Sequence, residues 1–278
     1  MKKFSAGLGA LLALLAFLPL QPAAAAADPL MIMVIAEEWP ELERQAEQRL
    51  EADPMDSAAL HALGRLSIDP EVGSERLRQA LLKQAESCIA ARPADPLCQL
   101  AYGQILGVEL NHLGMFDALG SVGKVQQAFE AAVAGAPQDF DARESLLTFY
   151  LRAPGFVGGS SRRARKNADD FARIDADRAR LLYALIDLQD DNPAKAEQEM
   201  AGLPAASVDE DLNRLVAKRW LSIGQAYLDA DSSERAIAAL TRALAHGAPS
   251  VVANAQQALD KIGAARQTAQ AGGAPLAR

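Results

Sequence analysis

Apolar residues recur at helical spacing along almost the whole 278-residue chain, and this pattern restricts the fold more than any other feature. Half of the residues are apolar but only 5% are aromatic, which favours thin helix-on-helix packing. Strand-like composition is confined to LMIMVIA at 30–36, which can equally begin a buried helix. Turn signals interrupt the helical pattern: ADP at 52–54, RPADP at 92–96, APQD at 136–139, DNP at 191–193 and GAPS at 247–250. The sequence therefore predicts an all-α fold of antiparallel helical hairpins.

The first 27 residues have the composition of a signal peptide. A pair of lysines precedes an apolar segment at 6–20, and an alanine run follows at 23–27. We expect cleavage between Ala25 and Asp28, and export to the periplasm of a Gram-negative bacterium. The alternative is an uncleaved anchor, but the apolar segment is short for a spanning helix of roughly 20 residues. After cleavage we expect no stable membrane insertion.

The charge of the chain bears on two kinds of partner, nucleic acid and anionic membranes. Asp and Glu number 36 against 28 Lys and Arg, and the predicted signal peptide contains two lysines and no acid. The mature chain is therefore more acidic than the net charge of −8 of the whole sequence. Such a charge disfavours non-specific binding to nucleic acid or to anionic membranes.

The chain contains two cysteines, Cys88 and Cys98, on either side of a proline-containing turn. In an oxidising compartment an even pair at this spacing is a candidate disulfide. The spacing is not the CxxC of redox-active pairs. The alternative is a pair of buried free thiols.

One segment, residues 217–250, resembles a tetratricopeptide repeat (TPR). Large and small residues alternate in two helices in the family's pattern: Trp220, Ile223, Gly224 and Tyr227 in the first, and Ala236, Leu240 and Ala243 in the second. Other segments match more weakly and vary in length. The resemblance implies a right-handed α-solenoid of five to six degenerate TPR-like hairpins over residues 28–266, followed by a flexible tail at 267–278.

A second resemblance covers Gly120–Gly159, which contains GKVQQAF, then DARESLLTFY, then the turn APGFVGG. This combination is similar to a family of exported proteobacterial TPR proteins with an APGxxGG turn. No reaction is associated with that family. The resemblance therefore implies a fold and an exported location, and no activity.

The glycine-rich turn lacks the spacing of a nucleotide-binding loop, and the segment before it is helical. We predict a structural turn within one hairpin, formed by Pro154, Gly155, Gly158 and Gly159. Pro154 ends the preceding helix, and the three glycines supply positive φ angles. Phe156 and Val157 are expected to fill the core of the neighbouring hairpin, and Ser160 or Ser161 to cap the next helix.

Four cations follow the turn, at the start of a helix where the macrodipole favours anions: Arg162, Arg163, Arg165 and Lys166. One interpretation is ion pairing with acids across the hairpin or one turn along: Asp141, Glu144, Asp169 and Asp170. The alternative is a site for an anion or an acidic peptide beside the turn.

Motifs for catalysis and metal binding are absent from the sequence. The three histidines, His61, His112 and His246, lie far apart, and no HExxH, paired-cysteine or GxSxG motif occurs. No calcium-binding loop is present. We therefore expect a protein that is not an enzyme and has no metal and no cofactor.

The TPR resemblance implies that a protein or peptide partner binds in a concave groove lined by the first helix of each hairpin. The repeat register places these residues in the groove: His61, Arg65, Leu100, Gln104, Glu144, Thr148, Arg152, Leu181, Lys218, Leu221, Gln225 and Leu228. The protein would then be an adaptor or scaffold of unknown oligomeric state, and self-association through the solenoid ends would indicate a purely structural role. The alternative is a small-molecule-binding accessory component of a periplasmic transport system, with a closed apolar pocket near four phenylalanines: Phe116, Phe129, Phe149 and Phe156.

Overall fold

The computed structural model describes residues 28–69, 71–110, 115–203, 207–245 and 247–272. The predicted signal peptide and the last six residues lie outside these ranges. None of the described residues is in a β-strand, so the predicted all-α class is confirmed. The helices are α1 (Pro29–Ala36), α2 (Trp39–Ala52), α3 (Ser57–Ser67), α4 (Glu75–Ala91), α5 (Pro96–Leu110), α6 (Met115–Gly135), α7 (Phe140–Arg152), the 3-10 helix η1 (Gly155–Val157), α8 (Ser161–Ala172), α9 (Ala176–Gln189), α10 (Pro193–Ala201), α11 (Glu210–Asp229), α12 (Ser233–Ala243) and α13 (Pro249–Gly272).

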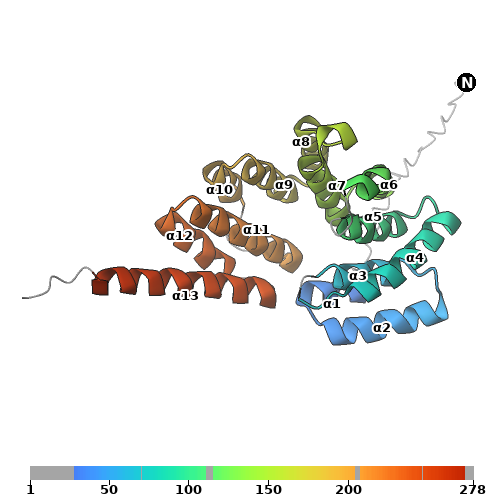
Figure 1. The fold of residues 1–278 in the computed structure, drawn as a ribbon, viewed down its shortest axis with the longest axis horizontal. Helices are drawn as coiled ribbons and strands as arrows, with labels where there is room; N and C mark the ends of the chain where they lie inside the picture. The colour runs from blue at the N-terminus through green and yellow to red at the C-terminus, as the bar shows by residue number, and fades with distance from the viewer. Residues whose placement is uncertain (1–27, 70, 111–114, 204–206, 246, 273–278) are drawn as a thin grey trace, which may run out of the picture.

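Consecutive helices pair into six hairpins, from α1–α2 to α11–α12, and α13 packs against the last pair. The first helices of the hairpins also stack, α1 on α3, α3 on α5, α7 on α9, α9 on α11 and α11 on α13. Figure 1 shows the hairpins following one another along an arc from blue α1 to red α13. This arrangement is an α-solenoid, in which each hairpin buries its apolar face mainly against its neighbours.

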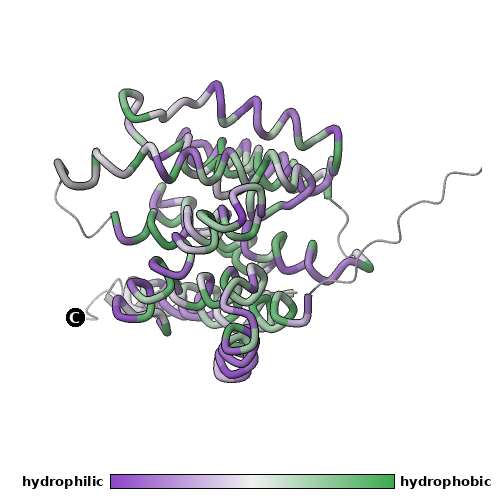
Figure 2. The backbone as a smooth tube through the Cα atoms, turned by 90° about the vertical axis from the view of Figure 1, so that its right-hand side faces the viewer, coloured by the Kyte–Doolittle hydropathy of each residue, from purple (hydrophilic) through white to green (hydrophobic). Residues whose placement is uncertain are grey.

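Hydrophobic and hydrophilic residues are interspersed along the helices (Figure 2), as expected of helices with one buried face. In each of two hairpins, a glycine in the first helix lets the two helices pack close together. A Cβ atom at Gly103 of α5 would lie 2.6 Å from the Phe129 ring of α6, and one at Gly224 of α11 would lie 2.7 Å from Leu240 of α12. The small residue in the first helix therefore accommodates the large residue of the second.

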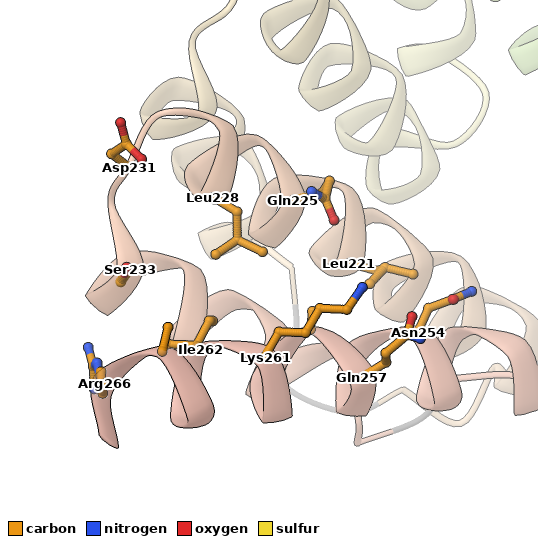
Figure 3. A pocket seen from close by; sticks show the side chains of 12 residues that line it. Leu221, Gln225, Leu228, Asp231, Ser233, Asn254, Gln257, Lys261, Ile262 and Arg266 are labelled. Atoms are coloured by element: carbon orange, nitrogen blue, oxygen red, sulfur yellow. The ribbon is translucent and has the colours of Figure 1, made fainter. Parts of the chain in front are cut away.

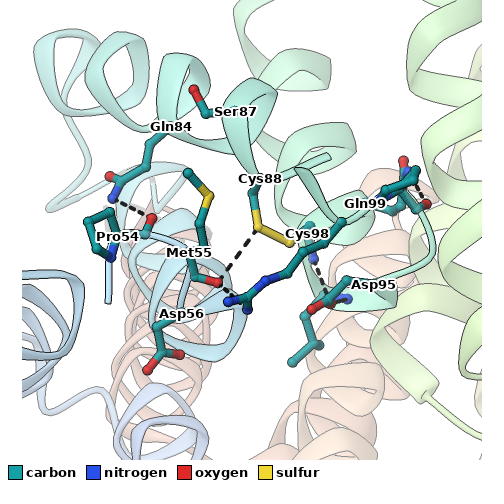
Figure 4. The surroundings of a disulfide bond; sticks show 12 residues. Pro54, Met55, Asp56, Gln84, Ser87, Cys88, Asp95, Cys98 and Gln99 are labelled. Atoms are coloured by element: carbon teal, nitrogen blue, oxygen red, sulfur yellow. Dashed lines mark hydrogen bonds between the residues drawn. A yellow bond between two sulfur atoms is a disulfide. The ribbon is translucent and has the colours of Figure 1, made fainter. Parts of the chain in front are cut away.

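The two cysteines form a disulfide that joins neighbouring hairpins (Figure 4). Cys88 lies near the end of α4 and Cys98 near the start of α5, with Cα atoms 5.7 Å apart. Both residues are fully buried. Nearby, Arg92 donates to the carbonyl oxygen of Met55 at 2.8 Å, so the second and third hairpins are also tied to the loop after α2.

The turn between α7 and α8 confirms part of the prediction. Helix α7 ends at Arg152, before Pro154, and Ser160 caps α8 by accepting a hydrogen bond from the backbone N–H of Arg163 at 3.3 Å. Of the three glycines, only Gly158 has a positive φ, 107°. Gly159 is required for a different reason, because a Cβ there would lie 1.7 Å from the carbonyl oxygen of Ala153.

The expectation that Phe156 and Val157 fill the core of the neighbouring hairpin is wrong. Phe156 does not fill a neighbouring core, because its side chain is 78% exposed, and Val157 is only half-buried. A Cβ at Gly155 would meet no atom within 4 Å, so nothing in the structure requires glycine there. The tail predicted from residue 267 begins as helix, since α13 continues to Gly272.

Candidate functional site

One face of α7 is polar and meets helices from other hairpins. Asp141, Glu144, Ser145 and Thr148 follow helical spacing and therefore share this face. Asp139 starts the helix by accepting a hydrogen bond from the backbone N–H of Ala142 at 2.8 Å. The side chains of this face contact α3, α5 and α11.

Helix α3 contacts α7 through a histidine and an arginine. Arg65 Nη1 lies 3.3 Å from Asp141 Oδ1, and His61 Nε2 lies 3.8 Å from Asp141 Oδ2. His61 is buried, and neither of its ring nitrogens has a hydrogen-bond partner in the described chain. Burial is the main reason why the pKa of His61 falls to about 4, with Asp141 opposing the decrease. The imidazole is therefore neutral at pH 7.

Helix α11 contacts the same face of α7 through two cations. Arg219 donates to Glu144 Oε1 at 2.5 Å, and Lys218 Nζ lies 3.6 Å from Glu144 Oε2. Burial by itself raises the pKa of Glu144, but Lys218, Arg219 and Arg65 outweigh that effect and lower the pKa to about 2. The carboxyl group is therefore ionised in the folded protein under all but strongly acidic conditions.

These ion pairs join helices that are two hairpins apart, α3 with α7 and α7 with α11. We call the six residues the central charge cluster: His61, Arg65, Asp141, Glu144, Lys218 and Arg219. Gln104 of α5 adds a hydrogen bond from its Nε2 to Ser145 Oγ at 3.1 Å. The first helices of the hairpins share an inner face, and side chains of the protein itself fill this part of it. A partner bound there would have to displace ion pairs.

The structure corrects several predicted groove residues. Leu100 and Leu181 are core residues with 1% and 0% exposure, and His61 and Gln104 are also buried. The repeat register predicted the helices that carry these residues, but the side chains are buried within the protein and do not line an open groove. Arg65, Glu144 and Lys218 keep some exposure but belong to the central charge cluster. Thr148 is half-buried and Arg152 is exposed.

The last three predicted groove residues do line a groove. Leu221, Gln225 and Leu228 of α11 border a groove of about 730 Å³ between α11, the start of α12 and α13. Figure 3 shows Leu228 extending toward Ile262 of α13, while Lys261 extends from α13 toward Leu221. The full lining is Leu221, Gln225, Leu228, Asp231, Ser233, Asn254, Gln257, Ala258, Lys261, Ile262, Ala265 and Arg266. We call this surface the C-terminal groove.

The C-terminal groove combines an apolar floor with a polar border. The apolar residues of its lining come from both α11 and α13. Its two cations, Lys261 and Arg266, are exposed and form no ion pair within the described part of the chain. The single acid of the lining, Asp231, lies at the turn between α11 and α12. An apolar floor with a few charged groups at its edge is the composition of surfaces that bind peptide segments. The α13 residues were not predicted, because the repeat register assigned groove positions only to the first helix of each hairpin.

Two of the four cations after the glycine turn form ion pairs within the protein. Lys166 pairs with Asp170 at 2.7 Å, as one interpretation predicted. Arg163 pairs with Glu130 of α6 instead of an acid on α7. Arg163 also lies over the Tyr150 ring, 4.4 Å from its centroid. The corresponding distance for Arg165 and the Tyr183 ring is 4.9 Å.

The pocket expected near four phenylalanines is not supported where the structure describes them. Phe129 and Phe149 are buried in the core, whereas Phe156 is exposed. The side chain of Phe116 lies outside the described residues. Within the described ranges, no group of three or more His, Cys, Asp or Glu side chains could hold a metal ion. The same ranges contain no helix that is long and apolar enough to cross a membrane.

The hairpins and their stacking define an α-helical repeat protein. The chain matches no protein-family model and no curated protein. Among solved structures it is similar to TTC0263, a thermophilic TPR protein of Thermus thermophilus, with 18% identity and a TM-score of 0.49 over 75% of this chain and 98% of that one. It is also similar to a tetratricopeptide repeat protein of Parabacteroides merdae, with 13% identity and a TM-score of 0.39 over 82% of this chain and 96% of that one.

Proposed function

We propose that this protein is an exported, non-enzymatic TPR-like scaffold that binds a segment of a partner protein in the C-terminal groove. The observation that carries the proposal is the composition of that groove. Two leucines of α11 and two alanines and one isoleucine of α13 form its floor. Two cations without ion-pair partners in the described chain lie at its edge. A segment with apolar side chains followed by acidic ones is complementary to this surface.

Two features support an exported location. The first is the predicted signal peptide, and the second is the disulfide between Cys88 and Cys98, since disulfides persist mainly in oxidising compartments. Fractionation of cells that express the full chain tests this part of the proposal. We expect the protein in the periplasm with a new N-terminus between residues 26 and 28. A cytoplasmic, uncleaved chain would contradict export.

The binding part is tested by crosslinking the tagged full chain in its native cells and identifying the captured proteins by mass spectrometry. Lys261→Glu with Arg266→Glu reverses the charge at the edge of the groove, and both positions are exposed, so this variant is expected to fold. Leu228→Glu introduces a charge into the floor. The matched control is Ala264→Glu, which adds a charge to an exposed position of α13 that does not line the groove.

One captured protein that is lost with both groove variants and retained with Ala264→Glu would support the proposal. A captured protein that is equally abundant with all variants would exclude the groove as its site. Recovery of the protein alone would exclude the adaptor role. Circular dichroism of each purified variant distinguishes lost binding from lost folding.

A further inference from the structure

The connection between α7 and α8 is longer than two helices in a hairpin require. Three residues join α9 to α10, and three join α11 to α12. Eight residues, 153–160, join α7 to α8, and they include the helix η1. The additional residues do not place Phe156 in the core; they place its side chain at the surface.

Hydrogen bonds hold this connection in one conformation. The backbone N–H groups of Val157 and Gly159 both donate to the carbonyl oxygen of Pro154, at 3.0 and 3.1 Å. Ser160 donates to the carbonyl oxygen of Tyr150 at 2.7 Å, which fixes the end of the turn on α7. A rigid turn loses little conformational entropy when it binds a partner.

This rigid turn presents a large aromatic side chain to solvent. Phe156 is 78% exposed, and it is the only aromatic residue among the large apolar side chains that are exposed in the described chain. Its neighbours Pro154 and Gly155 are also exposed, so nothing in the turn covers the ring. Burial of such a ring would be favourable, and rigid aromatic side chains are frequent anchors of protein interfaces.

Two arginines flank the turn in the sequence without ion-pair partners in the described ranges. Arg152 is the last residue of α7, and Arg162 lies in the first turn of α8. Both are exposed, whereas the nearby Arg163 and Lys166 are paired with acids. The turn that presents Phe156 is therefore flanked in the sequence by two exposed arginines that form no ion pair in the described ranges, although the protein as a whole is acidic.

We propose that Phe156, Arg152 and Arg162 form a second docking surface, separate from the C-terminal groove, for a partner protein with an apolar pocket bordered by carboxylates. One rigid ring is complementary to a pocket, and the arginines select an acidic border. A membrane surface is disfavoured, because binding at a bilayer usually requires a wide apolar face and here a single large side chain is exposed.

The test places the photocrosslinking residue p-benzoylphenylalanine at position 156 of the full chain in its native cells. We expect one crosslinked protein, whose yield falls at least tenfold when Arg152→Glu and Arg162→Glu are combined with the crosslinker. The control places the same residue at Ile174, which is 50% exposed in the turn after α8, and should not give this species. With the purified partner, Phe156→Ala should raise the Kd at least tenfold and Ile174→Ala less than twofold.

Four outcomes would overturn the proposal. They are the absence of a crosslinked protein, a yield that charge reversal does not change, the same species from position 174, and a crosslink to a second copy of this chain. Phe156-dependent sedimentation with phosphatidylglycerol vesicles would assign the surface to a membrane instead. The Phe156→Ala variant is expected to fold, because its side chain makes no contribution to the core.

Discussion

Glu37 and Ser250, which are 213 residues apart in the sequence, connect the two ends of the solenoid. Ser250 donates from its backbone N–H to Glu37 Oε2 at 2.7 Å, and its hydroxyl donates to Glu37 Oε1 at 2.5 Å. Glu37 follows α1, and Ser250 lies in the first turn of α13. The carboxylate thus satisfies a free N–H group at a helix N-terminus, where the macrodipole also favours negative charge.

The Glu37→Ala substitution is expected to release α13 from α1. The free energy of unfolding should fall by about 1–2 kcal/mol, the usual effect of removing a side chain that caps a helix. Urea unfolding measures this loss, and hydrogen exchange should show faster exchange at residues 250–253. The matched control is Glu38→Ala, an exposed neighbour that makes no side-chain hydrogen bond in the described chain. Equal stability of the two variants would contradict the capping role.

The Glu144→Gln substitution is expected to destabilise the central charge cluster. It leaves Arg219, which is 5% exposed, without its charged partner. The free energy of unfolding should fall by about 3 kcal/mol, because breaking a buried ion pair leaves an uncompensated charge. Urea unfolding at pH 7 measures this loss. The control is Glu43→Gln on the exposed face of α2, which should change the free energy of unfolding by less than about 0.5 kcal/mol.

The same residue should give an acid-dependent loss of stability. The pKa of Glu144 is about 2 in the folded protein, below the 4.5 of an ordinary glutamate. A carboxyl group with a lowered folded pKa stabilises the protein fully above pH 4.5, and this contribution disappears as the pH falls to about 2. The difference in stability between the original chain and Glu144→Gln should therefore shrink over this interval. A constant difference would show that the charge of Glu144 does not stabilise the fold.

His61 should affect stability in a higher pH interval than Glu144. Its pKa is about 4 when folded and 6.5 when free, so between these values only the unfolded chain takes up the proton. Stability should therefore decrease as the pH falls from 6.5 to 4, by up to about 3 kcal/mol. The His61→Leu substitution should remove this dependence of stability on pH. It also removes two buried ring nitrogens that have no hydrogen-bond partner in the described chain. Parallel pH profiles of the two proteins over this interval would contradict the prediction.

Reduction of the disulfide should weaken the junction of the second and third hairpins. In the chain-entropy model, closing a loop of this length stabilises by about 3 kcal/mol. Urea unfolding with and without a reducing agent measures the effect. The Cys88→Ser, Cys98→Ser double variant should have the stability of the reduced original chain, both with and without the reducing agent. Its lack of response to the reducing agent separates loss of the bond from other effects of the reagent.

Sequence patterns predicted the local structure better than the surface. The hairpins, the end of α7 before Pro154 and the cap at Ser160 depend on nearby residues, so they could be predicted. The central charge cluster depends on how strongly the solenoid curves, and small shifts in each hairpin decide whether α3 and α11 reach α7. Periodicity contains no such information, so the filled inner face and the contact between Glu37 and Ser250 were not predicted.

Substitutions in the glycine turn should separate the two physical reasons for glycine there. Gly159→Ala places a Cβ 1.7 Å from the carbonyl oxygen of Ala153, so the backbone must move and the hydrogen bond from Ser160 to Tyr150 is lost. We expect a loss of about 2–4 kcal/mol, and a smaller loss of about 1–2 kcal/mol for Gly158→Ala from its positive φ. Gly155→Ala is the control, since its Cβ meets nothing within 4 Å, and should change stability by less than about 0.5 kcal/mol. Urea unfolding of the three variants tests this order. A Gly155→Ala variant as unstable as Gly159→Ala would mean that the whole turn, and not these contacts, requires glycine.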